Sequence, residues 1–255
     1  MQARIVQTAR GAQWLLDGWH LFRAAPLGWL AMVFAYWLLM TLVSVVPLVG
    51  VAAASIMVPA FSVGFMAAAR AAARKAPVEL VLLFEGFRNH LRSQLILGVA
   101  YFACLALVLA ATVLADGGAL AGWMLSAHRP SEEVLHSDAF LAALGAAAAL
   151  YTPVLMMFWF APPLAAWHAI APAKALFFSF FACLINWRAF LAYGAVTTVV
   201  ALALPLAVVS VVALASLGVP AMSLVFPLLV VLLPTLFASF YASYRDVFRA
   251  DQGTL

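Results

Sequence analysis

Residues 94–115 read QLILGVAYFACLALVLAATVLA, a continuous run without a single Asp, Glu, Lys or Arg. An α-helix needs about 20 mostly apolar residues to cross the hydrocarbon core of a bilayer. Five other stretches meet the same requirement, and they occupy residues 27–47, 50–69, 139–165, 189–217 and 220–244. The sequence therefore predicts an all-α, polytopic membrane protein with six transmembrane helices.

The composition of the whole chain agrees with this fold class. Hydrophobic residues make up 68% of its 255 residues and charged residues only 9%, whereas a water-soluble domain carries about 25% charged residues. This balance excludes a soluble enzyme, and the two cysteines, Cys104 and Cys183, lack the spacing of a disulfide framework. Residues 1–255 are expected to form a single integral membrane domain.

The positive charges predict the orientation of the chain. Twelve of the 13 Lys and Arg residues lie in the N-terminal segment, the 70–92 and 166–188 loops or the C-terminal tail. The remaining one, Arg129, lies in the acidic 116–138 loop. Because basic loops stay on the cytoplasmic side, we expect both termini in the cytoplasm of a bacterial cell and residues 116–138 in the periplasm. The net charge of +4 is then a topology signal, and nucleic acid is not expected as a partner.

A three-fold internal repeat is a further prediction. Each unit would consist of an interfacial amphipathic helix followed by a helical hairpin. The units would cover residues 10–75, 76–171 and 172–249, and their first helices would lie in 10–23, 78–92 and 173–188. In this alignment Arg92 corresponds to Arg188 and Gly98 to Gly194. Chance matches between apolar helices are the alternative explanation.

Four arginines at equivalent places in these units are the candidate binding residues. They are Arg70, Arg92, Arg188 and Arg245, and His168 takes the place of Arg70 in the middle unit. A basic residue at an anionic membrane surface contributes about 1 kcal/mol to lipid attraction. We therefore expect a basic collar that binds membrane lipid, another membrane protein or a second copy of the chain. The alternative is that these arginines only orient the spans.

The sequence contains no reactive constellation. Metalloprotease and nucleophile-elbow motifs are absent, and the spans contain no ionisable acid or base pair. Ser44 and Thr112 are expected to bond to carbonyls of their own helices. His128 and His136 accompany carboxylates in the outer loop, where a solvated polar surface is the commoner arrangement. No catalytic residue, metal site or cofactor is therefore expected, and the chain is not expected to be an enzyme.

Prolines are the most distinctive residues inside the spans. Pro227 and Pro234 lie on nearly one face of the last span, and each frees a backbone carbonyl. If that face lined an aqueous path, the carbonyls would bind water or solute; if it packs on protein, the prolines only shape the helix. We expect both prolines to be dry and to face protein.

Several stretches at the basic ends of the spans resemble an uncharacterised family of proteobacterial six-span inner-membrane proteins. The family is most frequent in betaproteobacteria and is known as a domain of unknown function. The matching stretches are GFMAAAR at 64–70, LFEGFR at 83–88, APPLAAWH at 161–168, KALFFS at 174–179 with NWR at 186–188, and YASYRDVF at 241–248. The resemblance implies residence in the inner membrane, and it implies no known catalytic residue.

These observations favour a non-enzymatic scaffold or accessory subunit that binds lipid or another membrane protein. The alternative is a carrier or channel for a small or lipidic solute. A solid core with an exposed apolar flank would favour the scaffold, and a cavity lined by prolines would favour the carrier.

Overall fold

A computed structural model describes residues 3–47, 49–126, 129–214 and 221–248 of the chain. Every regular element in these residues is a helix. In chain order the helices are α1 (Thr8–Ala24), α2 (Pro26–Ser44), α3 (Gly50–Ala73), η1 (Leu80–Phe84), α4 (Glu85–Arg88), α5 (Leu91–Asp116), α6 (Ala119–Ser126), α7 (Glu132–Leu135), α8 (Asp138–Phe158), α9 (Ala161–His168), α10 (Pro172–Ile185), α11 (Trp187–Leu214) and α12 (Ala221–Val247). The all-α class is confirmed.

Six segments of the described chain are long and apolar enough to cross a membrane. They are Pro26–Ser44, Gly50–Ala73, Leu91–Asp116, Asp138–His168, Trp187–Val211 and Pro227–Val247. Each overlaps one of the six predicted spans, so that prediction is confirmed. The order of a short helix followed by a pair of spans recurs three times along the chain, while the three-fold repeat stays a prediction.

The fourth span is broken, which the sequence analysis did not predict. α8 ends at Phe158 and α9 begins at Ala161, with Pro162 and Pro163 in its first turn. A proline in the first turn of a helix is tolerated because its missing N–H has no partner there, but the same residue cannot continue a preceding helix. The two prolines therefore start a new helix.

The segment 78–92 is not one amphipathic helix. The 3₁₀ helix η1 leads into the short α4, and the chain then reverses at His90, whose φ of 56° is left-handed. Leu83 is fully buried, whereas Leu80 and Leu91 are exposed. The prediction of a single amphipathic helix over 78–92 is therefore wrong, although α1 and α10 do lie where short helices were predicted.

The packed part of the protein, which we call the hub, lies where the short helices meet the basic ends of the spans. α1 packs on α11 and α12, α3 packs on α5, and α10 packs on α8 and α9. Two clusters of buried side chains fill the hub, one around Trp14, Phe160 and Leu164 and the other around Trp29 and Phe65. The first helix is thus a core element and not a peripheral one.

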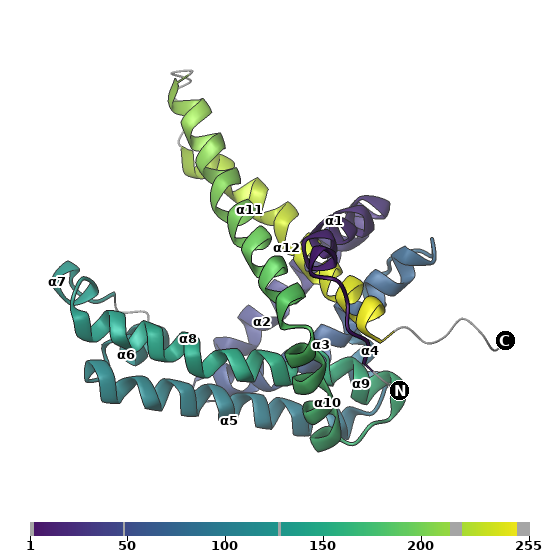
Figure 1. Ribbon diagram of the computed structural model, residues 1–255, viewed down its shortest axis with the longest axis horizontal. Helices are drawn as coiled ribbons and strands as arrows, with labels where there is room; N and C mark the ends of the chain where they lie inside the picture. Colours follow the sequence, from purple (N-terminus) through teal and green to yellow (C-terminus); the bar gives the residue numbers. More distant parts are fainter. Residues whose placement is uncertain (1–2, 48, 127–128, 215–220, 249–255) are drawn as a thin grey trace.

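The spans leave the hub as diverging hairpins, which we call arms. In Figure 1 the α5–α8 pair extends to one side of the hub while the α11–α12 pair rises in another direction. The Tyr101 and Tyr151 hydroxyls, 3.0 Å apart, link α5 to α8. Between residues 194 and 211 of α11 no side chain is buried. The protein is therefore a packed hub with exposed arms, and the expectation of a solid core holds only for the hub.

Candidate functional site: the hub and its arginines

An ionic network joins the two ends of the chain inside the hub. The Arg10 guanidinium of α1 lies 2.6 Å from an Asp246 oxygen of α12 and 3.0 Å from an Asp17 oxygen. The same Asp246 oxygen accepts a hydrogen bond from Trp14 Nε1 at 3.0 Å. Arg245 completes the network, 3.2 Å from Asp17. The four charged residues of the network line a polar pocket of about 480 Å³ together with Arg4, Val6 and Gln7.

The two carboxylates hold the Arg10 charge in place. Partial burial disfavours the cation, but the hydrogen bonds and charges of Asp246 and Asp17 outweigh it, so the pKa of Arg10 is raised above its ordinary value. Arg10 is a permanent cation between two anions. The network therefore fixes α1 against α12, and its positive charges are largely compensated within the protein.

Arg70, near the C-terminal end of α3, contacts α4 and α9. Its guanidinium lies 3.3 Å from a Glu85 oxygen and sits over the Trp167 ring, 4.3 Å from the ring centroid. Both contacts stabilise a guanidinium, the first by charge and the second by the ring quadrupole. His168 Nε2, one residue further along α9, lies 2.6 Å from the Tyr244 hydroxyl of α12. The ends of α3, α9 and α12 are thus connected in series.

Asn186 fixes the N-terminal segment, residues 3–7, to the hub. Its Oδ1 accepts a hydrogen bond from the Val6 N–H at 2.8 Å, and its Nδ2 donates to the Arg4 and Ala182 carbonyls at 2.9 Å. The Arg4 N–H donates in turn to the Val247 carbonyl at 2.9 Å. The side chain is 2% exposed, so its loss would leave buried backbone groups without partners.

Two buried polar side chains satisfy the break in the fourth span. Ser179 of α10 accepts from the Phe160 N–H at 2.9 Å and donates to the Met156 carbonyl at 2.7 Å. Gln94 of α5 donates to the Pro162 carbonyl at 3.0 Å. A helix can break inside a membrane protein only where such partners exist, so the Ser179 contacts from α10 make the break possible, while Gln94 holds α5 against the first turn of α9.

The four candidate arginines fall into two groups. Arg70 and Arg245 are paired with carboxylates, as described above, and these ion pairs connect helices within the hub. Arg92 and Arg188 are exposed, and no ion pair joins either of them to another described residue. Arg188 instead lies over the Trp187 ring at 5.4 Å. The collar of four equivalent arginines stays a prediction, but the four environments are not equivalent.

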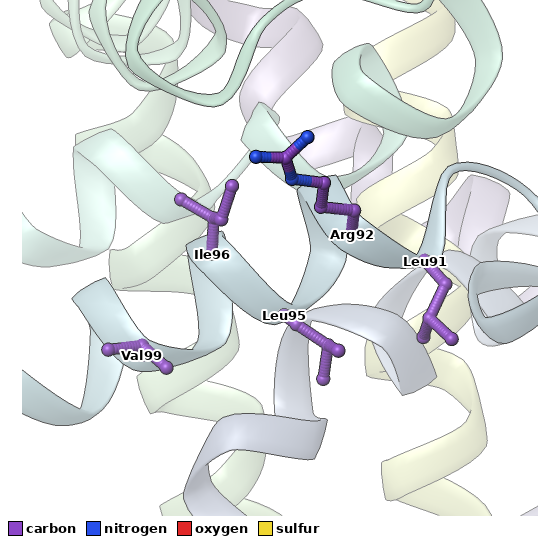
Figure 2. Close-up of a pocket in the computed structure, with 5 residues that line it drawn as sticks. All are labelled: Leu91, Arg92, Leu95, Ile96 and Val99. Carbon is purple, nitrogen blue, oxygen red and sulfur yellow. The ribbon is translucent and has the colours of Figure 1, made fainter.

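Arg92 stands at the head of a shallow apolar groove on α5. The groove has a volume of about 450 Å³ and is lined by Leu91, Leu95, Ile96 and Val99 besides the arginine. Figure 2 shows the guanidinium bent back along α5 on the side of Ile96, while Leu91 and Leu95 form the neighbouring row. A single cation thus lies beside an otherwise apolar surface.

The prolines of the last span do not share one environment. Pro234 is buried, as expected, whereas Pro227 is exposed. The expectation that both face protein is therefore wrong for Pro227, because the arm containing α12 leaves the hub between the two positions. Ser44 and Thr112 bond to the Thr41 and Leu109 carbonyls at 2.9 and 2.7 Å, as predicted.

The described residues contain no group of three His, Cys, Asp or Glu side chains that could hold a metal ion. In the 116–138 loop His136 Nδ1 lies 2.7 Å from the Glu132 carbonyl oxygen at the short α7, and His128 lies outside the described residues. Three buried polar residues with the contacts described above, Ser179, Gln94 and Asn186, were missed by the sequence analysis. The proline pair at 162–163 was the signal for the first two.

Comparisons with known proteins agree with this architecture. The chain is 39% identical over 258 residues to a probable inner membrane protein of Burkholderia thailandensis, and the match covers 99% of this chain and 96% of that protein. No family model matches the chain, and no solved structure matches it. With six apolar helices and a relative of this identity over nearly its whole length, the chain belongs to the same family of betaproteobacterial probable inner membrane proteins.

Proposed function

We propose that the protein is a non-enzymatic scaffold or accessory subunit of the inner membrane, whose hub is a rigid platform and whose arms bind another membrane protein or lipid. The observation that carries the proposal is the contrast between the two parts. Trp14, Trp29 and Phe160 are fully buried in the hub, whereas residues 194–211 of α11 have no buried side chain. A platform with unpartnered arms offers surface for other membrane components.

The exposed arm has the features of a helix that receives a neighbour. Leu191, Val199 and Leu202 are each more than 60% exposed, and nothing lies within 4 Å of the position that a Cβ would take at Gly194. Glycine in a membrane helix lets another backbone approach closely. Lipid tails are as apolar as leucine, so lipid alone also satisfies such a face. The experiment must therefore separate protein from lipid neighbours.

We also propose that both termini lie in the cytoplasm, with the hub at that face. The support is the excess of positive charge at the hub ends of the spans, where Arg10, Arg70, Arg92, Arg188 and Arg245 lie. Reporter fusions after Ala127 and at Leu255 test it. We expect periplasmic reporter activity from the first fusion and cytoplasmic activity from the second, and the reverse pattern would refute the orientation.

Photo-crosslinking in native membranes tests the scaffold. A photoreactive residue is placed at Leu191, Val199 or Leu202, and in the matched control at Leu107, which is equally exposed on α5. We expect a discrete protein adduct from the α11 positions and a different or absent adduct from Leu107. Lipid adducts alone at every position would overturn protein binding by the α11–α12 arm. A second experiment introduces single cysteines along α12 around Pro227. Their labelling on one helix face by a membrane-impermeant thiol reagent would favour a carrier or channel over the scaffold.

A further inference from the structure

We infer that the groove headed by Arg92 binds one anionic phospholipid, with the lipid phosphate on the guanidinium and an acyl chain along Leu95, Ile96 and Val99. The inference deepens the proposed scaffold function, and it rests on that proposal for the position of Arg92 at the cytoplasmic headgroup layer. It assigns a ligand class to a single arginine instead of to the collar as a whole.

The charge of Arg92 is available to a ligand, unlike those of Arg70 and Arg245, and of the two candidates without an ion pair Arg92 is the one beside the apolar groove. Arg70 and Arg245 are compensated by Glu85 and Asp17, and Arg188 lies over an aromatic ring. No carboxylate and no ring contacts Arg92 among the described residues. A guanidinium presents a planar fork of donors that matches two phosphate oxygens. An anionic headgroup is therefore the complementary partner.

The backbone at the same place also favours an anion. Arg92 lies in the first turn of α5, and the N-cap residue His90 provides no side-chain hydrogen bond to that turn. The first N–H groups of a helix lack intrahelical partners and form the positive end of its dipole. The guanidinium itself bends back along α5 towards Ile96, so the helix terminus is a second, separate attraction for an anion. Ser93 and Gln94 donate to the His90 carbonyl, which leaves the N–H of Leu91 and Arg92 for a phosphate oxygen.

The groove offers an apolar surface for an acyl chain, which a free phosphate lacks. Leu91, Leu95, Ile96 and Val99 are between 43% and 54% exposed. Figure 2 shows the guanidinium between Leu91 and Ile96, with Val99 further along α5. A headgroup at Arg92 would therefore place its acyl chain beside these side chains. Long basic side chains at the ends of membrane helices reach towards the headgroups while their stems stay in the apolar layer. The site thus selects a phospholipid and not a soluble phosphate.

Native mass spectrometry of the full chain in mild detergent tests this inference. The protein is titrated with phosphatidylglycerol and, separately, with zwitterionic phosphatidylcholine. We expect wild type to retain a first phosphatidylglycerol in preference to phosphatidylcholine. Arg92→Gln should lower that preference about fivefold, the factor that corresponds to about 1 kcal/mol per basic residue at an anionic surface. Arg92→Lys should keep the charge attraction, and Arg74→Gln, which removes an exposed arginine outside the groove, should match wild type.

Three results would overturn the site. The first is an unchanged preference in Arg92→Gln, and the second is an equal loss in Arg74→Gln, which would show an unspecific surface effect. The third is displacement of the lipid by glycerol phosphate at the same concentration, which would show an anion site without acyl recognition. Because Arg92 makes no ion pair within the described chain, its variants should fold normally, and an unchanged melting temperature verifies this.

The lipid site and the scaffold can fail separately. If the α11 crosslinks to protein are present and Arg92→Gln keeps its lipid preference, only the Arg92 assignment is wrong. If the preference falls as expected and α11 gives lipid adducts alone, the scaffold proposal is wrong and the lipid site stands.

Discussion

Replacing Gly98 with alanine is expected to weaken the contact between α3 and α5. A Cβ at this position would overlap the Ile56 carbonyl oxygen and would lie 2.8 Å from the carbonyl carbon. Both atoms belong to the backbone of α3, so no rotation of a side chain can relieve the overlap. The helices must separate or shift, and this loses packing along the seam that α3 and α5 share.

The expected change in the free energy of unfolding is the difference between two opposing contributions. Overpacking of a well-packed contact costs about 1–3 kcal/mol, and a backbone clash belongs at the upper end of that range. Alanine regains about 1 kcal/mol over glycine through helix propensity. We therefore expect Gly98→Ala to lower the free energy of unfolding by about 2 kcal/mol. For a chain of this size that corresponds to a melting temperature lower by roughly 4–8 °C.

Gly194→Ala is the matched control, because the proposed repeat aligns Gly194 with Gly98 and the structure shows nothing near its Cβ position. There only the propensity term acts, so we expect a melting temperature equal to wild type or up to roughly 4 °C higher. The assay is thermal unfolding of each variant in mild detergent and in nanodiscs, followed by tryptophan fluorescence.

Two outcomes would contradict this reasoning. A Gly98→Ala variant as stable as wild type would mean that α3 and α5 do not approach as closely as described. A loss of stability in Gly194→Ala equal to that of Gly98→Ala would mean that α11 packs on a neighbour through this glycine. If that loss occurred in nanodiscs but not in detergent, the neighbour would be a component retained from the membrane.

Further predictions concern the hub. Asn186→Ala should release the N-terminal segment, residues 3–7, and cost about 1–3 kcal/mol through unpaired backbone groups. The loss should appear as faster proteolysis at the N-terminus, whereas an unchanged digestion pattern would contradict the Asn186 contacts. Asp246→Asn should weaken the attachment of α1 by on the order of 1 kcal/mol, since the paired Arg10 is a third exposed, and a double variant with Arg10→Gln should add little to it. Burial raises the pKa of the Cys183 thiol, which stays protonated at neutral pH; in a Cys104→Ala background a maleimide should therefore leave Cys183 unlabelled at pH 7, and rapid labelling would show that α10 opens.

The number of spans and the fold class could be predicted from the sequence because they depend on local composition. A run such as 94–115 has no stable place in water, whatever its neighbours are. The short helices α1 and α10 could also be located, since each lies in a stretch with several aromatic residues between two basic ones, Arg10 and Arg23 for α1 and Lys174 and Arg188 for α10. The segment 78–92 misled the prediction because a helical spacing of leucines and phenylalanines also fits a 3₁₀ turn followed by a reversal at His90.

The partners inside the hub could not be predicted, because each depends on contacts between distant parts of the chain. Asp246 looks like an interfacial charge in the sequence, yet its neighbours Arg10 and Trp14 come from the other end of the chain. In the sequence Ser179 looks like a serine whose hydroxyl bonds to a carbonyl of its own helix. In the structure that hydroxyl accepts a hydrogen bond from the Phe160 N–H at the break in the fourth span. The four arginines have the same sequence pattern, and only the contacts separate Arg70 and Arg245 from Arg92 and Arg188.

The division into hub and arms follows from the solvent in which each part lies. In water the exposed leucines of α11 would drive the arms together. In a bilayer, lipid tails cover these leucines without a free-energy cost, so apolar contact alone does not bring the arms together. What remains to hold the molecule together is close packing and polar contact, and the contacts between distant parts of the chain at Arg10, Arg70, Asn186 and Ser179 all lie in the hub. A partner that supplies such contacts to an arm would therefore fix its position relative to the hub, whereas a partner that offers only apolar surface would compete with lipid on equal terms. Binding that orders the arms must come from close backbone approach at positions such as Gly194 or from charge at the ends of the spans, where Arg92 lies.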